Sequence, residues 1–122
     1  MAFLHREVKI SGTGIDLVEI PRIARILERC GGSFLRKNFH PGEIASCKGL
    51  EAEYYAVLFA LKEAVLKSLG QGIFTLDLAE LKIEIEAGRA EITLPGILGE
   101  GRVISGAYSF DHDWAVAIAV IL

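Results

Sequence analysis

Asp16 is the first residue whose type and position could support chemistry. It follows the glycine turn Gly12-Thr13-Gly14 in the segment GTGIDLVE. An acid just after glycines, at the junction of a strand and a helix, can stand exposed at the edge of a pocket. The alternative is structural, because Asp16 and Glu19 have the i, i+3 spacing of a capping box with Asp16 as the helix N-cap. The segment by itself supports either interpretation.

Lys62 and Glu63 form the second candidate, an adjacent pair of opposite charges. Glu63 precedes Lys67 by four residues, and an exposed ion pair at that spacing contributes only a few tenths of a kcal/mol. The flanking residues argue for burial, since they are Ala60, Leu61, Ala64 and Val65. A half-buried charge needs a partner or a metal ion. An ion pair and a functional carboxylate are therefore both open.

The third candidate is the segment 109–113, which contains Ser109, Asp111 and His112. These residues are too close in sequence for a hydrolase triad, and the chain has no nucleophile-elbow motif. The structural alternative is a turn in which Asp111 and Asp113 bond to the local backbone. A single histidine in such a turn is most often a surface residue.

The elements that must position these residues begin with a short strand over 7–15 that leads into the glycine turn. Pro21 fits the first turn of a helix that runs to about Cys30, where Gly31-Gly32 stop it. The isoleucines of this helix share one face. Arginines line another face at spacings of three and four (Arg22, Arg25 and Arg29).

The rest of the chain predicts two more helices and then strands. His40-Pro41 opens a short helix to about Lys48, and the helical period of apolar residues predicts a long helix over 51–69, closed by Gly70. Alternating apolar and polar residues, bounded by turn signals, predict strands afterwards (81–85, 91–94, 103–109 and 114–122). Helices followed by antiparallel strands predict an α+β fold.

Composition narrows the class of protein. The 122 residues fit a single domain, 1–122. The net charge of −3 argues against a general nucleic-acid binder, and no apolar run is long enough to cross a membrane. The 52% hydrophobic content instead favours an oligomer. Two cysteines and a polar N-terminus indicate a cytoplasmic protein.

Together, the three segments resemble the holo-acyl-carrier-protein synthases. The residues that carry the resemblance are GIDLVEIPRI (14–23), FALKEAVLKSLG (59–70) and the loop at 109–112. They occur in the order and approximate spacing of that family, and the resemblance covers nearly the whole chain. It implies a 4′-phosphopantetheinyl transferase-like fold, in which a long helix packs on an antiparallel β-sheet. It also implies transfer of 4′-phosphopantetheine from coenzyme A to a serine of an apo-acyl carrier protein, with Mg²⁺, releasing 3′,5′-ADP.

The resemblance implies a role for each candidate residue. Asp16 and Glu63 would be the carboxylates that hold the metal, and Glu63 or a metal-bound water would accept the serine proton. Lys67 would be catalytic and, with Lys62, would lie near the coenzyme phosphates. The remaining contacts to coenzyme A would come from Gly70, Ser109 and His112, the histidine reaching over from a neighbouring subunit.

The resemblance also implies two kinds of protein partner. The family is typically a homotrimer with its sites at subunit interfaces, which would account for the high apolar content. Its first helix uses arginines to dock an acidic acyl carrier protein. Arg22 and Arg29 match those positions, and Arg25 shares their face by spacing only. Docking of this kind mainly raises the association rate and weakens with salt.

Three departures from the family pattern keep an alternative open. Val57 and Leu58 stand where the family has Gly-Arg, which removes an arginine available for phosphate. Asp111 stands directly before His112, where a carboxylate would repel phosphates unless it is protonated or turned away. His40 replaces a threonine and is expected to be a poorer N-cap. The alternative is a non-catalytic relative that binds a carrier protein or a nucleotide without transfer.

Overall fold

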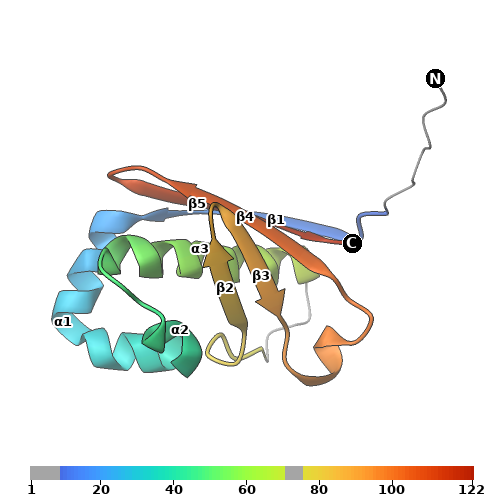
Figure 1. Ribbon diagram of the computed structural model, residues 1–122, viewed down its shortest axis with the longest axis horizontal. Coiled ribbons are helices and arrows are strands. Elements are labelled where there is room, and N and C mark those ends of the chain that lie inside the picture. The colour runs from blue at the N-terminus through green and yellow to red at the C-terminus, as the bar shows by residue number, and fades with distance from the viewer. Residues whose placement is uncertain (1–8, 71–75) are drawn as a thin grey trace.

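The computed structural model describes residues 9–70 and 76–122 and shows one antiparallel sheet with helices packed against it (Figure 1). The five strands are arranged in the order β1-β5-β4-β3-β2, and every pairing is antiparallel. This arrangement confirms the predicted α+β fold. The elements in chain order are β1 (Gly12–Glu19), α1 (Ile20–Asn38), α2 (Pro41–Ala45), α3 (Glu51–Leu69), β2 (Lys82–Glu86), β3 (Arg89–Thr93), the 3₁₀ turn η1 (Gly96–Gly99), β4 (Ile104–Phe110) and β5 (Trp114–Ile121).

The helix α3 is the centre of the core and has the predicted bounds. It packs mainly on β1 and β5, and Gly70 ends it with a positive φ of 80°, which glycine adopts without steric cost. The departures Val57 and Leu58 are 1% and 0% exposed. Both are therefore core residues that add apolar contacts to α3 and do not face solvent.

The expected glycine turn at Gly12-Thr13-Gly14 is wrong, because these residues lie inside β1. The strand begins later than predicted and extends to Glu19. The glycines are explained by close packing: a Cβ at Gly14 would lie 1.9 Å from the carbonyl oxygen of Ala64 on α3. A Cβ at Gly12 would lie 2.0 Å from the carbonyl oxygen of Ser68. The glycines let the strand approach the helix backbone.

The first helix was predicted to end at about Cys30, and its regular geometry breaks at that residue, although helical structure resumes after it. α1 begins at Ile20 with Pro21 in its first turn and continues to Asn38. Cys30 has non-helical angles, φ −149° and ψ 40°, so the glycine pair Gly31-Gly32 marks a kink and not a stop. Figure 1 shows the second part of α1 turning away from the direction of the first.

His40 caps α2 well, contrary to the expectation from its residue type. The N–H of Gly42 donates to His40 Nδ1 at 2.9 Å, and the N–H of His40 donates to Glu43 Oε1 at 2.7 Å. Together these bonds form a capping box, which satisfies amide groups left free at the start of a helix. The helix ends at Ala45, before the predicted Lys48.

The helices cover only one face of the sheet. On the other face, large apolar side chains of β1 and β5 are exposed, including Ile15 at 61%, Leu17 at 57% and Ile118 at 42%. Within residues 9–70 and 76–122, no helix has both the length and the apolar character needed to cross a bilayer.

Candidate functional site

The structure brings Asp16 and Glu63 together in one groove. Asp16 comes from β1 and Glu63 from α3, and both line a groove of 460 Å³ along α1. Asp16 points toward α3 because alternate residues of β1, such as Gly14 and Val18, face the helix. Two carboxylates distant in sequence thus share a wall of one cavity.

Glu63 is only partly exposed, and its environment disfavours its charged form. Burial raises the pKa of the Glu63 carboxyl, the negative charge of Asp16 raises it further, and the Lys67 ammonium opposes both. A carboxylate held in this way gains from accepting a proton or a cation. Glu63 therefore suits the role of a general base or a metal ligand.

Lys67 pairs with Asp16 and not with Glu63. Its ammonium donates to Asp16 Oδ1 at 2.8 Å and to the carbonyl oxygen of Ile15 at 3.0 Å. The capping box expected for Asp16 is therefore wrong: the N-cap of α1 is Glu19, and it makes no side-chain capping bond. Asp16 lies too early in β1 to reach the amides of α1. The Lys67 side chain is 54% exposed, so it can reach a ligand at the groove.

Lys62 lies in the interior, away from the groove. Its ammonium lies 2.7 Å from Glu43 Oε1, with both side chains 0% exposed. It also donates to the carbonyl oxygens of Leu78 and Leu81 at 2.6 Å each. Burial lowers the pKa of Lys62, and Glu43 partly offsets that effect. These contacts correct the expectation that Lys62 lies near the coenzyme phosphates, because its polar contacts are all internal.

Gly70, Ser109 and His112 do not line the groove of Asp16 and Glu63 in the single chain. Gly70 closes α3, one turn beyond Lys67. Ser109 lines a separate apolar hollow of 320 Å³ on the uncovered face of the sheet, beside Ile15. His112 is exposed in the turn between β4 and β5.

Asp111 is turned toward its own backbone. Its Oδ1 accepts hydrogen bonds from the N–H of Trp114 at 2.7 Å and of Asp113 at 2.8 Å. The bond from Trp114, followed by that from Asp113, lowers the pKa of the Asp111 carboxyl. The expected local backbone bonds are confirmed for Asp111. Its carboxylate stays ionised, with Oδ1 bonded to the turn, so its negative charge still opposes an anionic ligand near this loop.

The three arginines lie on the first half of α1 and are exposed. Arg22 also lines the groove. Arg25 lies 3.6 Å from Glu19, and this exposed pair contributes little to stability. The first half of α1 thus presents a row of positive charge that reaches the groove at Arg22.

Two features of the site escaped the sequence analysis. Trp114 and Phe59 line the groove. No local sequence pattern indicates this, because β5 and α3 meet at the groove only in the folded chain. Glu43 binds Lys62, and the i, i+3 spacing of His40 and Glu43 was a detectable capping-box signal.

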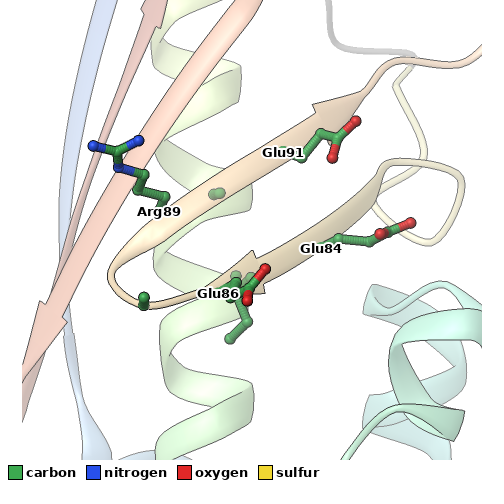
Figure 2. A pocket seen from close by; sticks show the side chains of 7 residues that line it. Glu84, Glu86, Arg89 and Glu91 are labelled. Carbon is green, nitrogen blue, oxygen red and sulfur yellow. The ribbon is translucent and has the colours of Figure 1, made fainter.

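A larger hollow of 620 Å³ lies on the hairpin formed by β2 and β3 (Figure 2). The charged residues on it are Glu84, Glu86, Arg89 and Glu91. Its excess of carboxylates would repel phosphate groups, and none of the predicted site residues lines it. The chemistry of the predicted residues therefore belongs to the smaller groove.

The described residues contain no cluster of three or more His, Cys, Asp or Glu side chains that could enclose a metal ion. The pair formed by Asp16 and Glu63 suits Mg²⁺ in particular, because this ion is commonly bound by one or two carboxylates together with waters and substrate phosphates. Burial and then the charge of Asp16 raise the pKa of Glu63, and a bound cation would offset both effects.

Comparisons with known proteins identify the family and agree with the fold. The model of the 4′-phosphopantetheinyl transferase superfamily matches residues 12–119. The holo-[acyl-carrier-protein] synthase of Syntrophus aciditrophicus is 38% identical over 121 residues, covering 93% of this chain and 94% of the relative. The synthase structure from Neisseria meningitidis has a TM-score of 0.82 at 28% identity, covering 93% and 99% of the two chains. The Helicobacter pylori synthase in complex with coenzyme A has a TM-score of 0.79 at 33% identity, covering 90% and 99%.

Proposed function

The chain belongs to the 4′-phosphopantetheinyl transferase superfamily, and from this premise we propose that it is a holo-acyl-carrier-protein synthase. It transfers 4′-phosphopantetheine from coenzyme A to a serine of an apo-acyl carrier protein and releases 3′,5′-ADP. The observation that carries this proposal is the shared groove of Asp16 and Glu63, flanked by Lys67 and by the arginines of α1. In this proposal Asp16 and Glu63 bind the metal, Lys67 binds phosphate, and the arginines of α1 dock the carrier protein.

Glu63 is the proposed base. The serine hydroxyl attacks the phosphorus that carries the pantetheine arm, and its proton passes to a Glu63 carboxylate oxygen. A bond forms between the serine oxygen and phosphorus, while the bond from phosphorus to the oxygen of 3′,5′-ADP breaks. Glu63 is available for this role because it lines the groove beside Asp16 and is partly exposed.

Asp16 and Glu63 are the proposed ligands of Mg²⁺. When bound, the ion would neutralise charge on the pyrophosphate of coenzyme A. Lys67 holds Asp16 in place through its 2.8 Å contact and has an exposed ammonium that can bind a coenzyme phosphate. The buried contacts of Lys62 assign that residue to support of the fold.

Arg22, Arg25 and Arg29 are the proposed docking residues for the acyl carrier protein. Their positive row reaches the groove at Arg22, so an acidic partner bound there would present its serine near Glu63. Electrostatic attraction of this kind raises the association rate and is screened by salt.

We further propose that the active form is a homotrimer. The apolar face of the sheet, which includes Ile15, Leu17 and Ile118, is exposed in the single chain, and such a face is stable when another subunit covers it. Ser109 and His112 lie on or beside this face, so they would contact coenzyme A bound at a neighbouring subunit. A cytoplasmic location is proposed because Cys30 and Cys47 are free thiols.

The test is mass spectrometry of apo-acyl carrier protein incubated with this chain, coenzyme A and Mg²⁺. A mass gain of one phosphopantetheine group that vanishes with EDTA supports the proposal. No gain across several carrier proteins, with folded protein verified by circular dichroism, rejects it. Binding of carrier protein without transfer would then identify a non-catalytic relative.

A further inference from the structure

α1 consists of two helical parts joined at one short segment. Cys30 is the residue with non-helical backbone angles inside this helix, and Gly31 and Gly32 follow it directly. Figure 1 shows the first part descending from the end of β1 and the second part turning toward α2. Sharp kinks in helices occur where glycines or prolines weaken the hydrogen-bond ladder.

Neither steric crowding nor a positive φ angle requires glycine at the two positions after the break. A Cβ added at Gly31 would meet nothing within 4 Å, and at Gly32 it would meet only the flexible end of Arg36, at 3.1 Å. Neither has a positive φ. This distinguishes them from Gly12 and Gly14, which a Cβ would drive into α3. At positions 31 and 32, alanine would fit and would favour the helix, so what glycine adds is conformational freedom.

The break separates two walls of the groove. Arg22, Ile23 and Ile26 line the groove from the part of α1 before the break, and Phe34 lines it from the part after. Phe34 packs on Phe59 of α3 with ring centroids 6.0 Å apart, which holds the second part against the core. The first part is anchored at its start, where Ile20 and Ile23 are 4% and 3% exposed. A tilt of the end of the first part, next to the break, therefore changes the width of the groove between Ile26 and Phe34.

The docking residues all lie on the first part of α1. Arg22, Arg25 and Arg29 precede Cys30 and are exposed, so the basic surface moves together with the groove wall. A partner that binds this surface and prefers one width of the groove shifts the population toward that width. The arginines that would receive the partner and the groove residues Ile23 and Ile26 lie on the same part of α1.

We propose that the Cys30–Gly32 segment is a hinge, about which the first part of α1 moves when the acyl carrier protein docks, opening the groove to its serine. The inference rests on the proposed function, since it gives the hinge a step in carrier docking. Coenzyme A binding does not need this motion, because the proposed coenzyme contacts lie on β1, α3 and the uncovered face of the sheet.

The double variant Gly31→Ala/Gly32→Ala tests the hinge. It should raise the melting temperature, because alanine fits at both sites, yet lower kcat/KM for carrier protein at least about fivefold while KM for coenzyme A stays the same. Ser33→Ala is the control, since it raises helix propensity at an exposed neighbouring position and keeps both glycines. A stabilised double variant with wild-type kcat/KM overturns the hinge, whereas a wild-type protein without transfer overturns the proposed function instead.

A fluorescence measurement follows the motion without activity. Trp114 is the one tryptophan of the chain and lines the groove, so it can quench a bimane label. The label is attached at Glu28→Cys, before the break, or at Lys37→Cys, after it, in a chain with Cys30→Ser and Cys47→Ser. Because Cys30 belongs to the hinge, the unlabelled serine chain must first show wild-type kcat/KM for carrier protein. Adding a tryptophan-free apo-acyl carrier protein should change the quenching of bimane fluorescence at position 28 and leave it unchanged at position 37. The substitutions Gly31→Ala and Gly32→Ala should suppress the change at position 28. Unchanged quenching at 28 with carrier bound, or equal changes at 28 and 37, overturns the hinge.

Discussion

Lys62→Met tests the burial of an ammonium group that the sequence placed at the coenzyme. Lys62 Nζ lies 2.7 Å from Glu43 Oε1, and neither side chain is exposed. The same group donates to the carbonyl oxygens of Leu78 and Leu81 at 2.6 Å each. Because methionine fills a similar volume, the substitution removes these polar contacts with little loss of packing.

The magnitude follows from the groups left behind. Removing one partner of a buried ion pair costs about 3–5 kcal/mol, because the remaining charge is uncompensated. Glu43 would keep the N–H donors of His40 at 2.7 Å and Ile83 at 2.8 Å, which moderates the cost, while the two carbonyl oxygens left without a donor add to it. We expect the free energy of unfolding to fall by about 4 kcal/mol. For a chain of 122 residues, that lowers the melting temperature by about 15 °C.

Urea unfolding followed by circular dichroism, at one fixed protein concentration, measures this loss. Lys82→Met is the matched control, because that lysine side chain is 43% exposed and its removal should change stability by less than about 0.5 kcal/mol. Lys62→Met/Glu43→Leu should recover part of the loss by removing both buried charges. A loss below about 1 kcal/mol in Lys62→Met would refute the interior placement, since only exposed ion pairs are that weak.

Three further predictions concern Glu63, the docking arginines and the packing of β1 on α3. Glu63→Gln should abolish transfer and the rise in melting temperature that Mg²⁺ gives the wild type. In EDTA, Glu63→Gln should raise the melting temperature at about pH 7 but not at about pH 4. The pKa of Glu63 is raised in the fold, so the wild type loses stability as the carboxyl ionises with increasing pH, and glutamine does not ionise. Equal changes in melting temperature at both pH values would contradict this. Arg22→Glu/Arg29→Glu should raise KM for carrier protein more than for coenzyme A, most strongly at low salt, and equal effects on both substrates would reject the docking surface. Gly14→Ala should cost about 3 kcal/mol in urea unfolding, because its Cβ would lie 1.9 Å from the carbonyl oxygen of Ala64; an unchanged midpoint would show that β1 and α3 can separate freely.

Local signals were sufficient for most of the secondary structure. The bounds of α3 follow from the helical period of its apolar residues and from Gly70, and the structure has the same residues, Glu51–Leu69. The later strands lie close to the alternating segments that predicted them. These elements are specified by neighbours in sequence, through side-chain periodicity and capping, so a single chain read in order contains the information.

Local signals misassigned the glycines and the charged residues of the same segments. Gly12 and Gly14 were predicted to form a turn, and Lys62 was expected to face the ligand together with Glu63. Glycine permits both a tight turn and close packing of a strand on a helix. Only the position of the α3 backbone against β1 decides between the two. Consecutive residues of a helix point in directions about 100° apart, so Lys62 and Glu63 meet different surroundings.

The sequence by itself determined which residue types are available for chemistry, the order of helices and strands, and the family to which the chain belongs. Only the tertiary structure decided which charges meet: Asp16 with Lys67 beside Glu63 in the groove, and Lys62 with Glu43 in the core. The physical reason is that a charge is stable in the fold only where a partner or water reaches it, and that partner comes from a distant part of the chain.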